Sequence, residues 1–229
     1  MTNSIHASAL QYAGHMTQIE TISVSSGPVS IENFYDQAAS VIGLIETIRG
    51  SERSYDAIVI AAACDPGIAP VRELVEIPVI GIGEAAMHLA SLVANKFSII
   101  TVFPRIVPLI QRAVEQSGLQ GKCNSIRSIE SCVLDTEGKS TVVEKQLYEA
   151  SIQAFEYDKA EAICLGCSGM TKFAEDLEKK INIPVFDGVV SAIKLAEALV
   201  EMHKKTSKLM TYQSPSHKEY SGIVKIVEP

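Results

Sequence analysis

The chain has 229 residues, 47% of them hydrophobic and 21% charged, which suffices for one large domain or two small ones and excludes disorder over most of its length. The net charge of -7, without a basic patch, argues against nucleic acid as a partner. No apolar run reaches the roughly 18 residues of a membrane span, and the first residues lack a secretory pattern, so we expect no membrane contact and a cytoplasmic location.

Short apolar runs alternate with amphipathic stretches from residue 57 onward. The runs are continuous and rich in β-branched residues, as in strands buried on both faces of a parallel sheet. The expected strands are 57–61, 77–81, 97–102, 161–165 and 183–186, and the expected helices are 69–74, 84–94, 106–117, 139–156, 171–180 and 189–205. This alternation predicts an α/β fold. A polar tail follows from residue 206, with a short strand expected over 222–227.

One pattern occurs twice along the chain. Each copy has Tyr-Asp, an apolar strand, a cysteine, a small turn, Ile-Pro-Val and an alanine-rich helix. The first copy begins at Tyr55 and contains Cys64, and the second begins at Tyr157 and contains Cys167. Chance similarity of strand–turn–helix units is the alternative. We favour two pseudo-symmetric Rossmann-like lobes with parallel sheets, the first formed by 1–95 plus 189–229 and the second by 96–188.

The five cysteines and five histidines limit the chemistry of the chain. An odd number of cysteines argues against a disulfide framework. The histidines are scattered and none stands at metal-ligand spacing with another histidine or a cysteine pair, so no metal site is expected. Buried free cysteines commonly fill space in a core, and this is the role expected for Cys123, Cys132 and Cys164.

Cys64 and Cys167 each follow a predicted strand and precede a glycine-containing turn. Ligands of open α/β sheets bind beyond the carboxyl ends of the strands, so both thiols are expected in one cleft between the lobes. Racemisation suits such a pair, because one thiolate removes a proton from one face of a carbon while a thiol returns one to the other face. A reference thiol pKa of about 8.5 is close enough to neutrality for a helix N-terminus to tune it.

Three further features have more than one interpretation. The Gly-Ile-Gly-Glu segment at 81–84 is half of a dinucleotide-binding turn, but the third glycine is missing, which favours a simple helix start. Asp65 and Asp187 each follow a predicted strand and would either orient a substrate or cap a helix, and capping is the commoner role.

Several segments resemble the aspartate/glutamate/hydantoin racemase family, and hydantoin and allantoin racemases most of all. They are Gly-Pro at 27–28, Asp-Pro-Gly at 65–67, PVIGIGEA at 78–85, FSIITVFP at 97–104, LGCSGM at 165–170 and INIPVFDGVVSAIKLAEALV at 181–200. The resemblance implies a two-lobed racemase that acts without a cofactor on five-membered hydantoin rings, including allantoin, by means of two cysteines. It also implies a homo-oligomer.

The resemblance assigns candidate site residues. Cys167 matches the second catalytic cysteine and Asn3 matches a ligand-binding asparagine. Thr101, Ser168 and the backbone amides near Gly169 are expected to hold the ring oxygens.

Two departures from the family pattern concern the first lobe. The family places its first cysteine three residues before the Asp-Pro-Gly turn, where this chain has Ala62, and Cys64 stands two residues later. A two-residue shift keeps side-chain parity on an extended strand, so Cys64 is expected to face the same cleft and to act as the first catalytic cysteine. Family members also have a strand that leads into the asparagine, and we expect none before Asn3 in this sequence.

Three functions are therefore considered. The first is racemisation of a hydantoin-type ring by Cys64 and Cys167. The second is a decarboxylase or cis–trans isomerase of the same superfamily that uses Cys167 alone, which Ala62 favours. The third is a degenerate, non-catalytic member, which the shifted cysteine and the absent strand favour.

Overall fold

The alternation of strands and helices is present in the computed structural model, which describes residues 2–49, 54–136 and 140–216. All strand pairings among these residues are parallel. The strands are β1 (Ile58–Ile60), β2 (Val79–Gly81), β3 (Phe97–Thr101), β4 (Cys123–Ser128), β5 (Ala162–Leu165) and β6 (Val185–Phe186). The α-helices are α1 (Thr2–Tyr12), α2 (Phe34–Ile48), α3 (Ile68–Leu74), α4 (Ile82–Val93), α5 (Val107–Gln116), α6 (Thr141–Glu156), α7 (Ala174–Ile181) and α8 (Gly188–Glu201).

The strands form two sheets of unequal size. One contains β1 and β2, and the other has the order β4-β3-β5-β6. The described residues also contain the short 3-10 helices η2 (Pro104–Ile106), η3 (Leu134–Thr136), η4 (Ser168–Phe173) and η5 (Met210–Tyr212). The five expected strands are confirmed, and the parallel α/β class with them, whereas the strand expected over 222–227 lies outside the described residues.

Both faces of the smaller sheet are buried. Val79 of β2 packs with Ile60 and residues of α2 and α3, whereas the next residue, Ile80, packs with α1, α4 and α8. Successive strand residues point to opposite faces, so this alternation places helices on both sides, as a parallel sheet requires. The four-stranded sheet lies in a separate, larger core, to which α4 also contributes. Each sheet thus has its own hydrophobic core, consistent with the expected two-lobe arrangement.

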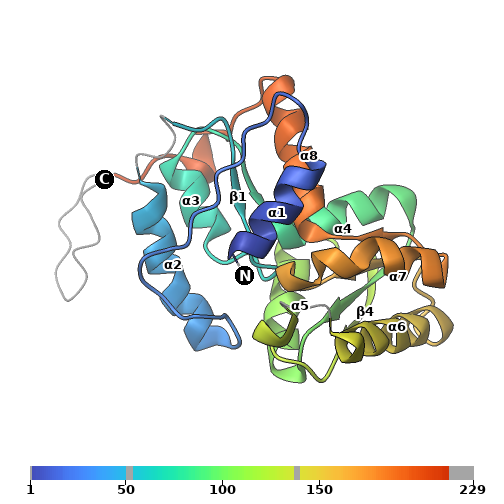
Figure 1. Cartoon of the computed structure of the whole chain (residues 1–229). Coiled ribbons are helices and arrows are strands. Elements are labelled where there is room, and N and C mark those ends of the chain that lie inside the picture. Colours follow the sequence, from blue (N-terminus) through green and yellow to red (C-terminus); the bar gives the residue numbers. More distant parts are fainter. Residues whose placement is uncertain (1, 50–53, 137–139, 217–229) are drawn as a thin grey trace.

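Helices α4 and α8, the alanine-rich helices of the two sequence repeats, lie side by side near the centre of the molecule (Figure 1). Their first turns are in close contact. A Cβ atom on Gly188, the first residue of α8, would lie 2.6 Å from the carbonyl oxygen of Ile82, the first residue of α4. Only glycine therefore allows the two helices to begin at this separation.

Three elements were not expected from the sequence. β4 is an edge strand in which Asn124, Ser125 and Arg127 interrupt the apolar pattern of a central strand. α2 begins after Asn33, whose side chain accepts a hydrogen bond from the amide of Asp36, and this capping signal was readable in the sequence. The third unexpected element is α1, which carries Asn3.

The boundaries of two expected helices differ by more than two residues from those observed. The helix expected over 171–180 begins as η4 and continues as α7, and the helix expected over 189–205 ends at Glu201. The segment beyond α8 is held on the smaller sheet, where the amide and hydroxyl of Thr206 donate to the carbonyl oxygens of Glu76 and Ile77. Within the described residues no helix is long and apolar enough to cross a membrane.

The close contact between α4 and α8 makes a specific prediction. Gly188→Ala forces a Cβ atom against the Ile82 carbonyl oxygen, and we expect it to lower the free energy of unfolding by about 1–3 kcal/mol. The matched control is Gly121→Ala, because a Cβ atom there has no neighbour within 4 Å. That control should stay within about 0.5 kcal/mol of the parent protein in urea unfolding. Equal effects of the two substitutions would contradict the proposed tight contact.

Candidate functional site

Cys167 stands at the junction between β5 and η4. Its backbone is extended, with φ -157°, and it forms the N-cap of η4. The side chain is buried, and burial raises the pKa of its thiol above the ordinary value. Two hydrogen bonds oppose this effect and lower the pKa: one from the backbone amide of Gly169, and one with the hydroxyl of Thr136, whose oxygen lies 3.8 Å from the sulfur and in which either atom could donate. The sulfur thus has two groups that favour its thiolate form.

Close packing holds these groups in place. A Cβ atom on Gly169 would lie 1.9 Å from the Thr136 hydroxyl oxygen, so a glycine is required for η4 to approach Thr136. Thr101 at the end of β3 is fully buried, and its hydroxyl donates to the carbonyl oxygen of Gly166 at 3.0 Å. The Thr101 hydroxyl therefore supports the residue before Cys167.

Cys64 lies in a turn beyond β1. The amide of Asp65 donates to the carbonyl oxygen of Ala62 at 2.9 Å, so residues 62–65 are folded back and not extended. The sequence-based argument that Ala62 and Cys64 share a side by strand parity is therefore wrong, because β1 ends at Ile60. Cys64 is 3% exposed, and burial together with the neighbouring Asp65 raises the pKa of its thiol to about 12.

Both thiols contribute to one buried cluster, although they follow strands of different sheets. Cys64 and Cys167 belong to the core of the four-stranded sheet, which also contains Met87 of α4 and Met170 of η4. The carbonyl oxygen of Cys64 accepts a hydrogen bond from Gln37 of α2 at 3.3 Å. Both cysteines expected from the sequence are therefore buried in the larger of the hydrophobic cores.

Asp65 caps the helix of the first repeat. Its two carboxylate oxygens accept the amides of Gly83 and Glu84 at 2.9 and 2.6 Å, in the first turn of α4. This is the capping role considered from the sequence, and the helix start expected at 81–84 is confirmed. The Glu84 side chain accepts the amide of Gly81, which completes the cap.

Asp187 caps the helix of the second repeat and lies near Cys167. Its Oδ1 atom accepts the amide of Val190 at 2.8 Å, whereas Oδ2 is buried and has no hydrogen bond among the described residues. Because Cys164 of β5 is in register with Phe186 of β6, Asp187 and Cys167 lie at the same sheet edge. Burial raises the pKa of Asp187, and the proximity of its carboxylate raises that of the Cys167 thiol.

The other expected ligand-binding residues lie along the segment after Cys167 and on α1. Ser168 is half-buried at the start of η4. Asn3 is exposed in the first turn of α1, and this helix packs against η4 and α8. The hydroxyl of Tyr12 at the end of α1 donates to Glu175 of α7, which ties the helix to the larger lobe. Figure 1 places the start of α1 in the middle of the molecule.

The remaining cysteines differ in exposure. Cys164 is buried in β5, as expected for a core residue, and Cys123 is half-buried. Cys132 is exposed, so the expectation that it fills space in the core is wrong. Among the residues described by the structure, no group of three or more His, Cys, Asp or Glu side chains could hold a metal ion.

Thr136 and Gln37 were not identified from the sequence. Both lie in segments without a recognisable motif, and only the tertiary structure brings them to Cys167 and Cys64.

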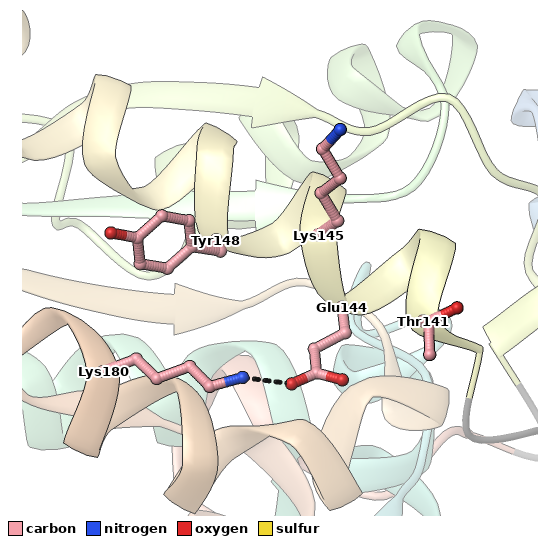
Figure 2. Close-up of a pocket in the computed structure, with 5 residues that line it drawn as sticks. All are labelled: Thr141, Glu144, Lys145, Tyr148 and Lys180. Carbon is pink, nitrogen blue, oxygen red and sulfur yellow. Dashed lines mark hydrogen bonds and ion pairs between the residues drawn. The ribbon is translucent and has the colours of Figure 1, made fainter.

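A surface pocket of about 280 Å³ between α6 and α7 lies outside this site (Figure 2). It is lined by Thr141, Glu144, Lys145, Tyr148 and Lys180, and Lys180 pairs with Glu144. None of the sequence-predicted site residues contributes to it.

The electrostatic influence of Asp187 on Cys167 predicts a shift in thiol reactivity. Asp187→Asn keeps an oxygen for the Val190 amide but removes the negative charge that disfavours the thiolate, so the pKa of Cys167 should fall. The rate at which iodoacetamide alkylates Cys167, measured by peptide mass spectrometry, should then begin to rise at a lower pH than in the parent protein. Asp36→Asn on α2 is the control and should leave the profile unchanged. If the alkylation profile of Asp187→Asn is the same as that of the parent protein, Asp187 does not influence the pKa of the Cys167 thiol.

Comparisons with known proteins identify the family to which the chain belongs. The sequence model of the Asp/Glu/Hydantoin racemase family matches residues 1–196. A hydantoin racemase of Pseudomonas sp. (strain NS671) is 44% identical over 223 residues, which cover 97% of this chain and 90% of that protein.

Two solved structures are also similar over most of their length. The allantoin racemase from Klebsiella pneumoniae superposes with a TM-score of 0.92 at 38% identity, covering 96% of this chain and 91% of that one. The allantoin racemase AllR from Pseudomonas fluorescens gives 0.93 at 31% identity, covering 96% and 94%. The chain therefore belongs to the Asp/Glu/hydantoin racemase family and is an enzyme of the racemase class.

Proposed function

We propose that the chain racemises a hydantoin-type ring, either a 5-substituted hydantoin or allantoin, by proton transfer between cysteine thiols and the ring carbon. The observation that carries the proposal is the setting of Cys167, at the carboxyl end of a parallel strand with the Gly169 amide and the Thr136 hydroxyl at its sulfur. The names of the similar proteins, hydantoin racemase and allantoin racemase, point to the same class of ring.

The proposed reaction balances without a cofactor. A thiolate takes the proton from the ring carbon, and the electron pair of the broken C–H bond moves into the adjacent carbonyl group to give an enolate. A thiol on the opposite face then donates its proton to the carbon, which leaves the second sulfur as a thiolate. Backbone amides of the η4 turn are suited to stabilise the enolate oxygen, because donors fixed in a buried site need no reorganisation.

The second thiol in this proposal is Cys64. It follows the strand of the first repeat that corresponds to the strand before Cys167, and it shares a buried cluster with Cys167. Its pKa of about 12 means that Cys64 is protonated at neutral pH and suits the role of acid in the first turnover. Ala62, which occupies the position of the family's first cysteine, supplies no thiol.

Asn3, Ser168 and the amide of Gly169 are proposed to bind the ring. Asn3 and Ser168 are accessible in the structure and lie on elements that contact each other, α1 and η4. Thr101 is proposed to act through Gly166, because its hydroxyl is fully buried and already donates to that carbonyl oxygen. The proposal also includes a homo-oligomer, which light scattering on the purified protein would test.

The proposal is tested by following optical rotation and deuterium uptake together. Purified protein is incubated in deuterated water with one enantiomer of allantoin or of 5-benzylhydantoin, and circular dichroism and NMR are recorded. Loss of optical activity with deuterium incorporation is the expected result. The absence of exchange on either ring would overturn the hydantoin assignment.

Three cysteine variants assign the roles of the thiols. Cys167→Ala and Cys64→Ala should each reduce racemisation by at least about 100-fold, the usual contribution of a positioned acid or base. Cys132→Ala removes an exposed thiol and is the matched control, for which we expect an unchanged rate. If Cys64→Ala is as active as the control, Cys64 is not the second acid–base group.

The position of Ala62 favours a second candidate, a decarboxylase or isomerase that uses Cys167 alone. Ala62→Cys distinguishes the two functions, because it places a thiol at the family position. Under one-thiol chemistry the parent protein does not racemise hydantoins, and Ala62→Cys should introduce or strongly increase racemisation. Under the proposed two-thiol mechanism the parent protein is already active and Ala62→Cys should change the rate by only a few-fold.

A further inference from the structure

A cavity of about 530 Å³ lies between the two lobes, outside the candidate site. Its walls are α2 and α3 of the smaller lobe and α5 of the larger one, and Tyr212 of η5 closes one side. Neither Cys64 nor Cys167 lines it, and none of the ring-binding residues proposed above contributes to it. The cavity is therefore distinct from the two thiols, although Gln37 and Asp65, which neighbour Cys64, contribute to its wall.

One charged group in this cavity has no counter-ion. The guanidinium of Arg112 lies 4.2 Å from the ring centroid of Phe34, and no carboxylate of the described residues lies within 4.0 Å of it. The other cation, Arg72, is paired with Glu84 at 2.5 Å. Asp65, the second acid of the lining, accepts the two amides that begin α4. Within the part of the chain that the structure describes, Arg112, on the exposed face of α5, is thus a cation of the cavity without a carboxylate partner.

The opposite wall of the cavity is apolar. Phe34, Gln37, Ala38 and Val41 of α2 are spaced at i, i+3, i+4 and i+7, and so form one face of that helix. The first turn of α3 continues this surface with Ile68. On the α5 side, Gln116 follows Arg112 by one turn and adds an amide beside the guanidinium. An occupant therefore meets a cation and an amide on one side and an apolar surface on the other.

We propose that this cavity binds a small organic carboxylate. Arg112 binds the carboxylate group, and the apolar body of the ligand packs on the face of α2 formed by Phe34, Ala38 and Val41. A guanidinium already stacked on a ring loses little side-chain freedom when it pairs with a planar carboxylate. The ligand contacts α2, whose Gln37 also donates to the carbonyl oxygen of Cys64, and α5 of the other lobe. The site is therefore placed where an occupant touches both lobes.

The test uses benzoate as the probe, with benzamide as its neutral isostere. Isothermal titration calorimetry on the parent protein should show saturable benzoate binding, with benzamide weaker by about tenfold or more, because it lacks the charge that pairs with Arg112. Arg112→Gln should reduce benzoate affinity by a similar factor and leave benzamide affinity unchanged. Lys145→Gln removes an exposed cation of α6 and should bind benzoate as the parent protein does.

A second variant separates the cavity from any other cationic surface. Ala38→Trp keeps Arg112 but fills the space beside α2, and it should abolish benzoate binding; Ala38 is exposed, so the bulky ring leaves the core intact. Absence of benzoate binding to the parent protein, or equal affinity of the parent protein and Arg112→Gln, would overturn the proposal. Because the readout is binding and not turnover, failure of the racemase proposal would leave these results unaffected.

Discussion

The buried carboxylate of Asp65 accepts the first amides of α4, and the path of the chain around Cys64 depends on this contact. The carboxylate belongs to the turn that follows β1, whereas the amides belong to the helix that follows β2. Burial of a carboxylate is costly unless its oxygens are hydrogen-bonded, so the turn can stay buried only while α4 begins at this place. The backbone around Asp65 is also constrained, with φ 46°, a conformation that few residues other than glycine adopt.

In the second repeat Asp187 caps α8 in the same way. Helices α4 and α8 pack against each other and so connect the two halves of the molecule. Because the first residues of α4 and α8 are in contact, the capped helix starts lie together between the two sheets. Each cap is close to one of the candidate thiols. The aspartates thus help to define the fold, and their charges add to the effect of burial, which is the main cause of the raised pKa values of Cys64 and Cys167.

Burial has opposing consequences for thiol chemistry at this site. It strengthens every hydrogen bond that a bound ring and its enolate would make, because the local dielectric is low. It also raises the pKa of both thiols, which reduces the fraction present as the reactive thiolate. At Cys167 the hydrogen bonds with the Gly169 amide and the Thr136 hydroxyl, which lower the pKa, each have a larger effect than the charge of Asp187, which raises it. At Cys64 the order is reversed, because the charge of Asp65 has a larger effect than the hydrogen bond with Gln37. The two thiols are therefore not equivalent in spite of the repeat in the sequence.

The sequence by itself determined the fold class, the buried strands and the junction that carries Cys167, because continuous apolar runs and glycine turns are local properties of the chain. It did not determine β4, whose polar edge-strand pattern differs from that of a central strand, or α1, for which we had recognised no helical signal. Only the tertiary structure decided that residues 62–65 fold back as a turn, and that Thr136 and Gln37 reach the two cysteines. These features depend on contacts between segments far apart in the sequence, and such contacts leave no periodic or compositional signal in any single segment.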